Sequence, residues 1–402
     1  MAFAFTTGLE FFRSTKEAVL RAQAILSVFA LAAAVAYGGS ARLRELLRHR
    51  VVLAIAGGAV LWTAITTLTS AQRSLSAESL ISVIFGALLF FCIWYISRDV
   101  PISALLILVP ATVINTIVVI LQEYGFWNPF SFGLVKSGHL SASGFIGNPN
   151  EVGAYLALCT VVLLVASEFL HGWKRWACAI ASAISLAGVF ISLTRTAVLA
   201  IAAALIVMAV RRSYKGALAI AGILLVALVI ATQFRVAALS RITAIPSQIS
   251  EGRWDYVLSD RLPAFLAAVE MFRDHPILGT GPRTFGFLFF PYRLELDRLY
   301  PNQLLIGAGT NFAEVHNDHL QLLAETGLPG YALFLAALVV LVVRSRPRDD
   351  PQSEYARFAW ELSPPFVAAV FVLALAFFPL HVAITRHLII TIAALITGWS
   401  RR

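Results

Sequence analysis

The sequence predicts an all-α polytopic membrane protein with about 11 to 12 transmembrane helices and one large extracytoplasmic loop that carries short helices. Three observations support this fold class: 59% of the 402 residues are hydrophobic, only 13% are charged, and the mean hydropathy is +0.81. One soluble core cannot bury so much apolar surface, so the bilayer must act as the solvent for much of the chain.

Eleven apolar runs approach the roughly 20 residues that a helix needs to cross a bilayer. Their approximate positions are 18–38, 51–70, 80–97, 102–122, 150–169, 177–193, 196–210, 216–234, 328–343, 360–379 and 381–399. Only Thr194 and Arg195 separate the sixth run from the seventh. One helix across both would be too long for a bilayer, which favours a tight helical hairpin. A twelfth span remains open, either in the N-terminal segment or after Asn317.

The basic residues of the linkers predict the orientation. When the linkers alternate between the two sides and the long loop is set aside, sixteen Lys and Arg fall on one side and seven on the other. The positive-inside rule makes the richer side cytoplasmic. The C-terminus is then inside, and segments 123–149, the turn at Arg195 and 235–327 face the extracytoplasmic space.

Three parts of one integrated membrane domain follow from these spans: an N-terminal transmembrane bundle at 1–234, the large loop at 235–327 and C-terminal transmembrane helices at 328–402. The loop is too long for a simple connection, so it is a candidate working surface. Within 262–273, Phe265, Val269 and Phe272 recur at helical spacing, which predicts an amphipathic helix on the membrane or over the bundle.

The cysteines and the net charge argue against other classes. Cys92, Cys159 and Cys178 lie inside apolar runs without metal-ligand spacing, so we interpret them as small core residues. The net charge of +9 is spread over linkers between apolar runs, which fits membrane orientation and gives no reason to expect a nucleic-acid partner.

Two arginines are candidates for anion binding, because a cation at membrane level is costly unless it has a partner or a ligand. Arg195, at the hairpin tip, either snorkels toward lipid phosphates or faces inward and grips a substrate phosphate with its planar fork. Arg261 either pairs with Asp260 on the surface or holds an anion at the start of the predicted helix.

A histidine follows in the segment Val315-His316-Asn317-Asp318-His319. Asn317 or Asp318 can cap the next helix and Gly327 can end it, so much of the segment has a structural explanation. The cap does not require His316. A neutral imidazole there could act as a general base on a hydroxyl, although a lone histidine is more often structural.

Together with Arg261 early in the long loop, four motifs in this order resemble the O-antigen ligase and O-antigen polymerase superfamily over roughly residues 140–345. The motifs are Gly144-Phe145-Ile146-Gly147-Asn148-Pro149-Asn150, Ser192-Leu193-Thr194-Arg195, His275-Pro276-Ile277-Leu278-Gly279-Thr280-Gly281, and His316-Asn317 followed after nine residues by Gly327-Leu328-Pro329-Gly330. The last is similar to the His-Asn-x9-Gly-x-x-Gly signature of that superfamily.

The resemblance implies a GT-C-like, inverting, metal-independent glycosyltransferase without a cofactor, in the bacterial inner membrane with its active site facing the periplasm. Such an enzyme moves a glycan from undecaprenyl pyrophosphate to an acceptor hydroxyl. The resemblance implies catalytic roles for His316, Arg195 and Arg261, with both arginines on the pyrophosphate. It implies further substrate contacts from Asn317, Asn148 and Asn150.

The acceptor leaves alternatives open. The spacing of the last motif favours a ligase that transfers O-antigen to lipid A-core in lipopolysaccharide biosynthesis. A polymerase of the same superfamily, with another glycan as acceptor, is the first alternative. An anion or solute transporter is the second; it is disfavoured because the acidic residues lie in linkers or near predicted helix ends, which leaves no mid-membrane carboxylate for a proton relay.

Overall fold

The computed structural model describes residues 9–128, 142–212, 245–252, 254–258, 260–299, 311–347 and 353–400, and within these residues it contains helices and no strand. The long helices are α1 (Leu9–Ala34), α3 (Arg50–Thr69), α4 (Arg73–Ile96), α5 (Leu108–Glu123), α6 (Pro149–Phe169), α7 (Gly172–Ile191), α8 (Arg195–Arg212), α15 (Asp318–Ser345), α16 (Glu354–Ala376) and α17 (Ala383–Trp399). Shorter elements are the π-helix Val35–Gly39, α2 (Ser40–Leu46), the 3-10 helix Ile102–Ile107, α11 (Ile245–Ser250), α12 (Trp254–Val257), α13 (Leu262–Asp274) and α14 (Phe285–Leu299).

Eight helical segments in the described part of the chain are long and apolar enough to cross a membrane. The predicted all-α multi-pass fold is therefore confirmed. Two more predicted spans correspond to α8, which is bounded by Arg195 and Arg212, and to α17, which is 17 residues long. The predicted span at 216–234 lies outside the described residues, and both the total of 11 to 12 spans and the three-part division of the chain stay predictions.

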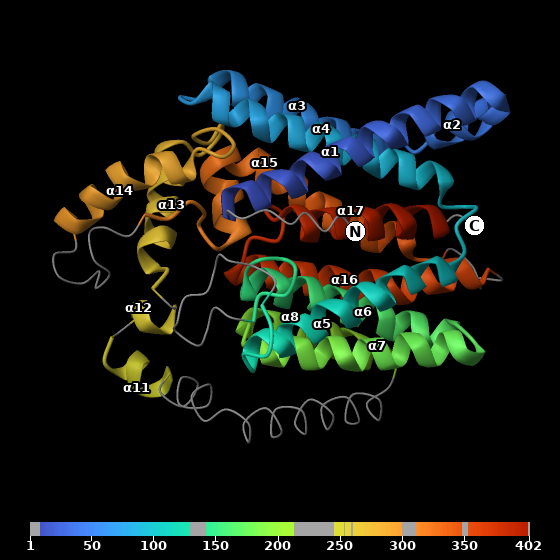
Figure 1. Ribbon diagram of the computed structural model, residues 1–402. Coiled ribbons are helices and arrows are strands. Elements are labelled where there is room, and N and C mark those ends of the chain that lie inside the picture. The colour runs from blue at the N-terminus through green and yellow to red at the C-terminus, as the bar shows by residue number, and fades with distance from the viewer. Residues whose placement is uncertain are drawn as a thin grey trace.

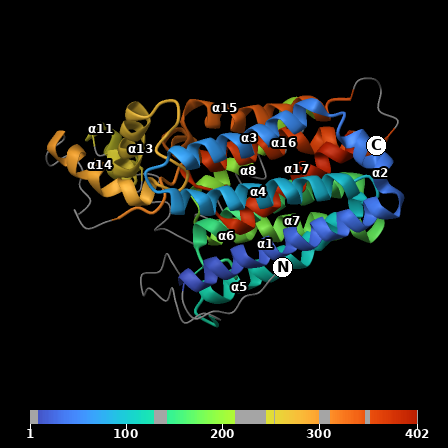
Figure 2. The same cartoon turned by 90° about the horizontal axis from the view of Figure 1, so that it is seen from above.

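The long helices form one bundle with the short loop helices at one end (Figure 1). Helices α1, α3 and α4 make one layer, α15, α16 and α17 a middle layer, and α5 to α8 the layer beyond it. Figure 2 shows the same bundle from above, with α11, α13 and α14 beyond the ends of the long helices. The predicted large loop therefore does carry short helices, and they gather at one end of the bundle.

Helix α6 is the centre of the α5–α8 layer. Its own residues are apolar or small on nearly every side, and 83% of its apolar stretch is buried, as expected for a helix without a polar face. Gly153 and Gly188 allow close approach, since a Cβ at Gly153 would meet the side chains of Ser192 and Thr194 and one at Gly188 would meet Leu156 and Thr116. Cys159 and Cys178 are buried in this region and Cys92 is buried in α4, which confirms them as core residues.

The predicted break between α7 and α8 is confirmed. Helix α7 ends at Ile191, Leu193 adopts a positive φ of 54°, and α8 begins at Arg195. At the turn the Thr194 hydroxyl donates to the carbonyl of Pro149, the first residue of α6. At the far end of α8 Arg211 pairs with Glu361 near the start of α16. The chain therefore reverses at 192–194, and this turn lies beside the N-terminus of α6.

The loop helix predicted at 262–273 exists as α13, but its fully buried positions are not those of the predicted apolar stripe. The buried positions on α13 are Pro263, Ala264, Ala267, Ala268 and Met271, whereas Phe265, Val269 and Phe272 are half-buried. Small side chains let α13 pack closely against α14 and α15, and the larger aromatic residues occupy the edges of that contact. Residue size, which hydrophobic spacing alone does not weigh, decides the buried face.

Candidate active site at one end of the bundle

Four helices start at the same end of the bundle, where the loop helices gather (Figure 1). These are α6, α8, α13 and α15. The turn before α8 contacts the start of α6, and α13 and α15 each contact the end of α16, through Arg261 and Asp318. Helix N-termini carry unpaired N–H groups and partial positive charge, so this end of the bundle favours an anion.

Asn148 and Asn150 lie at the start of α6. Asn148 is the N-cap, and its side-chain oxygen accepts a 2.8 Å hydrogen bond from the backbone N–H of Asn150. Because Thr194 bonds to Pro149, the structure brings the Asn148-Pro149-Asn150 motif together with the Arg195 turn. The capping bond gives Asn148 a structural role; substrate binding by the two asparagines stays a prediction.

Arg195 and Arg261 are neighbours although 66 positions separate them in the sequence. Arg195 is exposed at the first position of α8. Arg261 is half-buried at the N-cap of α13 and donates a 2.7 Å hydrogen bond to the carbonyl of Ala376, the last residue of α16. Burial, together with the positive charge of nearby Arg195, lowers the pKa of the Arg261 guanidinium. Two like charges held together at helix N-termini form a cationic site suited to an anion with several oxygens.

His316 lies directly before α15 and has a left-handed backbone with a φ of 60°. This conformation is uncommon for a residue with a side chain and persists only where the surroundings impose it. Its half-buried ring packs edge-on against Phe378, with the ring centroids 4.8 Å apart. The backbone and the aromatic contact together orient the imidazole.

Asn317 is the N-cap of α15, with its side-chain oxygen accepting a 3.0 Å hydrogen bond from Leu320 N–H. Of the two predicted capping residues, Asn317 is therefore the one used. Asp318, the first residue of α15, is fully buried and points instead at the turn between α16 and α17. His319 packs between α15 and α16, within 3.1 Å of the Phe371 carbonyl. The two histidines of the motif therefore differ in place: His316 lies before the start of α15, whereas His319 lies in the interface between α15 and α16.

The segment 376–382, which joins α16 to α17, connects these features. The Ala376 carbonyl accepts from Arg261, the Phe377 carbonyl accepts from Asp318 N–H, and the Phe378 ring packs on His316. One short segment therefore contacts both the cationic site and the histidine motif. Sequence reasoning had placed residues 377–379 and 381 inside two spans, whereas α16 ends at Ala376 and α17 begins at Ala383.

His381 is the residue that sequence reasoning missed. Its Nδ1 lies 2.6 Å from the Asp318 carboxylate, and the second Asp318 oxygen accepts from Leu380 N–H at 2.8 Å. Burial opposes a charge on this imidazole, but the carboxylates of Asp318 and Glu314 outweigh it and raise the pKa of His381 to about 10. His381 is thus a half-buried imidazolium at neutral pH. In the sequence His381 is visible only as a polar residue at the junction of two apolar runs. That position does not indicate that its partner is Asp318, 63 positions away.

The His275–Gly281 motif has a structural explanation. Thr280 and Gly281 donate backbone hydrogen bonds of 2.9 Å to the carbonyls of Ala324 and Glu325, and Leu328 N–H donates to the Pro276 carbonyl at 2.9 Å. Gly279 and Gly327 both have a φ of 66°. A Cβ at Gly279 would meet the backbone of Glu325, and a Cβ at Gly327 would meet the backbone of Ile277. Gly327 has non-helical backbone angles and forms a kink within α15. The motif is therefore bonded to this kink and fixes the position of the helix that His316 precedes.

The fold and this site define a class: an all-helical, multi-pass membrane protein with paired arginines and a histidine at one end of the helix bundle. A family model described as O-antigen ligase matches residues 180–335, a segment that contains Arg195, Arg261 and His316 but not Asn148 or Asn150. Residues 180–335 therefore match the O-antigen ligase domain, and the resemblance noted in the sequence is confirmed for this segment. Comparison with curated proteins gave no match.

The family is one of glycosyltransferases, so the protein is an enzyme of lipid-linked glycan transfer, of the ligase or polymerase type. Within the described residues no group of three or more His, Cys, Asp or Glu side chains is arranged to hold a metal ion. The metal independence of the reaction and the roles of the individual site residues stay predictions.

Proposed function

We propose that the protein is an O-antigen ligase, which transfers a glycan from undecaprenyl pyrophosphate to a hydroxyl of lipid A-core in lipopolysaccharide biosynthesis. The observation that carries the proposal is the pairing of Arg195 with Arg261, which concentrates two positive charges beside His316's segment. The site then faces the periplasm from the inner membrane, as the distribution of basic residues in the linkers predicts.

The two guanidinium groups hold the pyrophosphate. Each planar fork offers two parallel N–H donors to phosphate oxygens, which suits a leaving group that carries several charged oxygens. As the bond between the anomeric carbon and the pyrophosphate oxygen breaks, negative charge grows on that oxygen. Fixed cations stabilise this developing charge more than they stabilise the ground state, and so lower the barrier.

His316 acts on the acceptor. The acceptor hydroxyl oxygen attacks the anomeric carbon from the face opposite the pyrophosphate, and its proton passes to the imidazole of His316. A single displacement of this kind inverts the anomeric configuration. Support for this role comes from the rigid placement of the ring by its backbone conformation and by Phe378, because a general base must be held within hydrogen-bonding reach of the proton.

Glycan transfer by purified protein tests the proposal. Wild type and His316→Ala receive an undecaprenyl-pyrophosphate glycan and lipid A-core, with His171→Ala as a matched control, since His171 is an exposed histidine at the start of α7. We expect wild type and His171→Ala to modify lipid A-core and folded His316→Ala to lose transfer. A chelator should leave the wild-type rate unchanged.

Other outcomes separate the alternatives. Lengthening of the lipid-linked glycan without transfer to lipid A-core would make the protein a polymerase. A folded His316→Ala variant with normal transfer would remove His316 from the mechanism and leave the arginine site standing. A rate that depends strictly on an added divalent ion would contradict the proposed metal-independent chemistry.

A further inference from the structure

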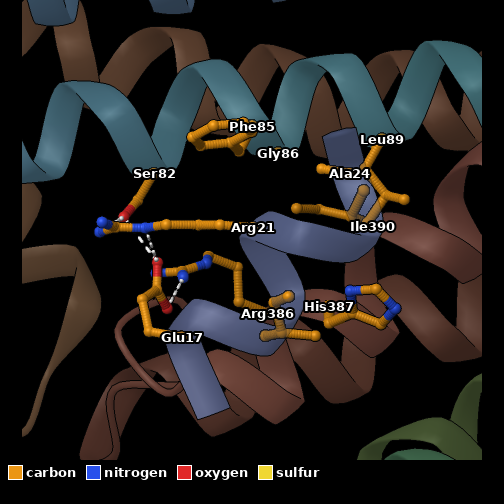
Figure 3. Close-up of a pocket in the computed structure, with 11 residues that line it drawn as sticks. Glu17, Arg21, Ala24, Ser82, Phe85, Gly86, Leu89, Arg386, His387 and Ile390 are labelled. Carbon is orange, nitrogen blue, oxygen red and sulfur yellow. Dashed lines mark hydrogen bonds and ion pairs between the residues drawn. The ribbon is translucent and has the colours of Figure 1, made fainter. Parts of the chain in front are cut away.

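A second polar site, made of other residues than the arginine and histidine site, lies in a pocket between α1, α4 and α17 (Figure 3). Glu17 and Arg21 project into it from α1, Ser82 from α4, and Arg386 from α17. None of these residues belongs to the motifs that the family resemblance explains.

The pocket contains two cations and one carboxylate. Arg386 lies 2.5 Å from one oxygen of Glu17, and Arg21 lies 3.4 Å from the other. The Ser82 hydroxyl donates to Glu17 at 2.7 Å and accepts from Arg21 at 3.1 Å. One negative charge cannot neutralise two arginines, so the charged residues lining this pocket leave an excess of one positive charge.

The position of the pocket makes this excess costly. Glu17 is near the start of the span Thr15–Tyr37, and Arg386 is in the first turn of α17, so the charges sit at the edge of the membrane-spanning region. An ion pair that joins α1 to α17 needs only one arginine, Arg386, for the one carboxylate of Glu17. A second cation at membrane level is expected to have a partner or a ligand of its own.

The surroundings indicate a lipid. Only 6% of the apolar stretch of α1 is buried, so this outer helix faces the bilayer. Leu20, Phe85 and Ile390 also line this pocket. A cationic end next to an apolar wall matches a phosphate followed by hydrocarbon chains.

We propose that this pocket binds the phosphate of an anionic membrane phospholipid, with an acyl chain lying along the apolar wall. The bound phosphate neutralises the excess charge of Arg21 and Arg386. Arg386 also donates a 3.4 Å hydrogen bond to the carbonyl of Leu380, whose N–H bonds to Asp318. The lipid site therefore adjoins the 376–382 segment that contacts the catalytic residues.

Native mass spectrometry of the full chain in detergent tests the site, with phosphatidylglycerol and phosphatidylcholine of identical acyl chains as probes. Glu17→Gln removes the competing carboxylate and keeps a hydrogen-bonding side chain. We expect it to bind phosphatidylglycerol about fivefold more tightly than wild type, because one unit of charge near lipid changes affinity by that order. Arg21→Gln should weaken binding by a similar factor, and neither variant should change the binding of phosphatidylcholine.

Arg175→Gln is the control for loss of one positive charge, since Arg175 is exposed at the start of α7. It should leave phosphatidylglycerol binding unchanged. If the cluster were only a structural tie, Glu17→Gln would bind no more phosphatidylglycerol than wild type, and that result would overturn the proposal. Displacement of the lipid by inorganic phosphate at equal concentration would also overturn it. Because the readout is lipid binding, loss of glycan transfer does not enter the test.

Discussion

The buried Asp318 and the half-buried His381 form a pair, with a 2.6 Å hydrogen bond from His381 Nδ1 to the Asp318 carboxylate. The pair joins the first residue of α15 to the turn between α16 and α17. The same turn contacts Arg261 through Ala376 and His316 through Phe378. The distance between His316, the proposed base, and the two arginines of the proposed pyrophosphate site therefore depends on the contact between Asp318 and His381. His381 belongs to none of the sequence motifs.

This pair predicts a pH dependence of stability. The pKa of His381 is raised to about 10 in the folded protein, whereas an unperturbed histidine in the unfolded chain has a pKa of about 6.5. The pair therefore contributes fully below pH 6.5, and its contribution declines until pH 10, where it is lost. Thermal unfolding in detergent should show stability falling over this window in wild type.

His381→Gln should flatten that slope. Asp318→Asn alone leaves the half-buried imidazolium of His381 without its carboxylate and should destabilise the protein by up to about 3 kcal/mol. The double variant should lose less than the sum of the two single losses, because the partners act on each other. Equal slopes in wild type and His381→Gln would show that His381 is not the titrating group.

Replacing either arginine by lysine should damage transfer while keeping the charge. Arg195→Lys or Arg261→Lys retains a cation but loses the planar fork, and we expect the rate to fall by about 100-fold or more. Steady-state transfer assays with the lipid-linked donor measure the effect. Arg175→Lys, at an exposed arginine, should be indistinguishable from wild type.

The repulsion between Arg195 and Arg261 predicts a trade between stability and binding. Arg195→Gln should raise the stability of the free protein by up to about 1 kcal/mol, because it relieves the repulsion between like charges. Inorganic pyrophosphate should stabilise wild type against heat and should stabilise Arg195→Gln much less, because a ligand stabilises only the fold that binds it. An equal thermal shift in both proteins would remove Arg195 from the anion site.

The contact between the His275–Gly281 motif and the α15 kink predicts a sharp glycine requirement. Gly327 has a positive φ, and a Cβ there would meet the backbone carbonyl of Ile277. Gly327→Ala should therefore destabilise the protein by at least about 2 kcal/mol. Gly57→Ala is the matched control, since nothing lies within 4 Å of the Cβ position at that glycine in α3. Its unfolding temperature should be unchanged or slightly raised.

Much of this architecture could be read before the fold was known. Spans are long apolar runs, so composition alone predicts them, and the break at Arg195 follows from the limited thickness of the bilayer. Asn317 as a cap and Gly327 as a break are local rules of helix ends, and α15 obeys both. The arginines and His316 were identifiable because charged and titratable side chains are conspicuous in an apolar chain.

Tertiary contacts decided the rest. The proximity of Arg195 to Arg261, the partnership of Asp318 with His381 and the Glu17 cluster each join residues more than 60 positions apart. Nothing local specifies such pairs, because they depend on how rigid helices pack and which ends they bring together. Close packing also explains why alanines rather than phenylalanines occupy the buried face of α13. Local sequence determines where helices start and end, whereas the close-packed bundle determines which of those ends share a site.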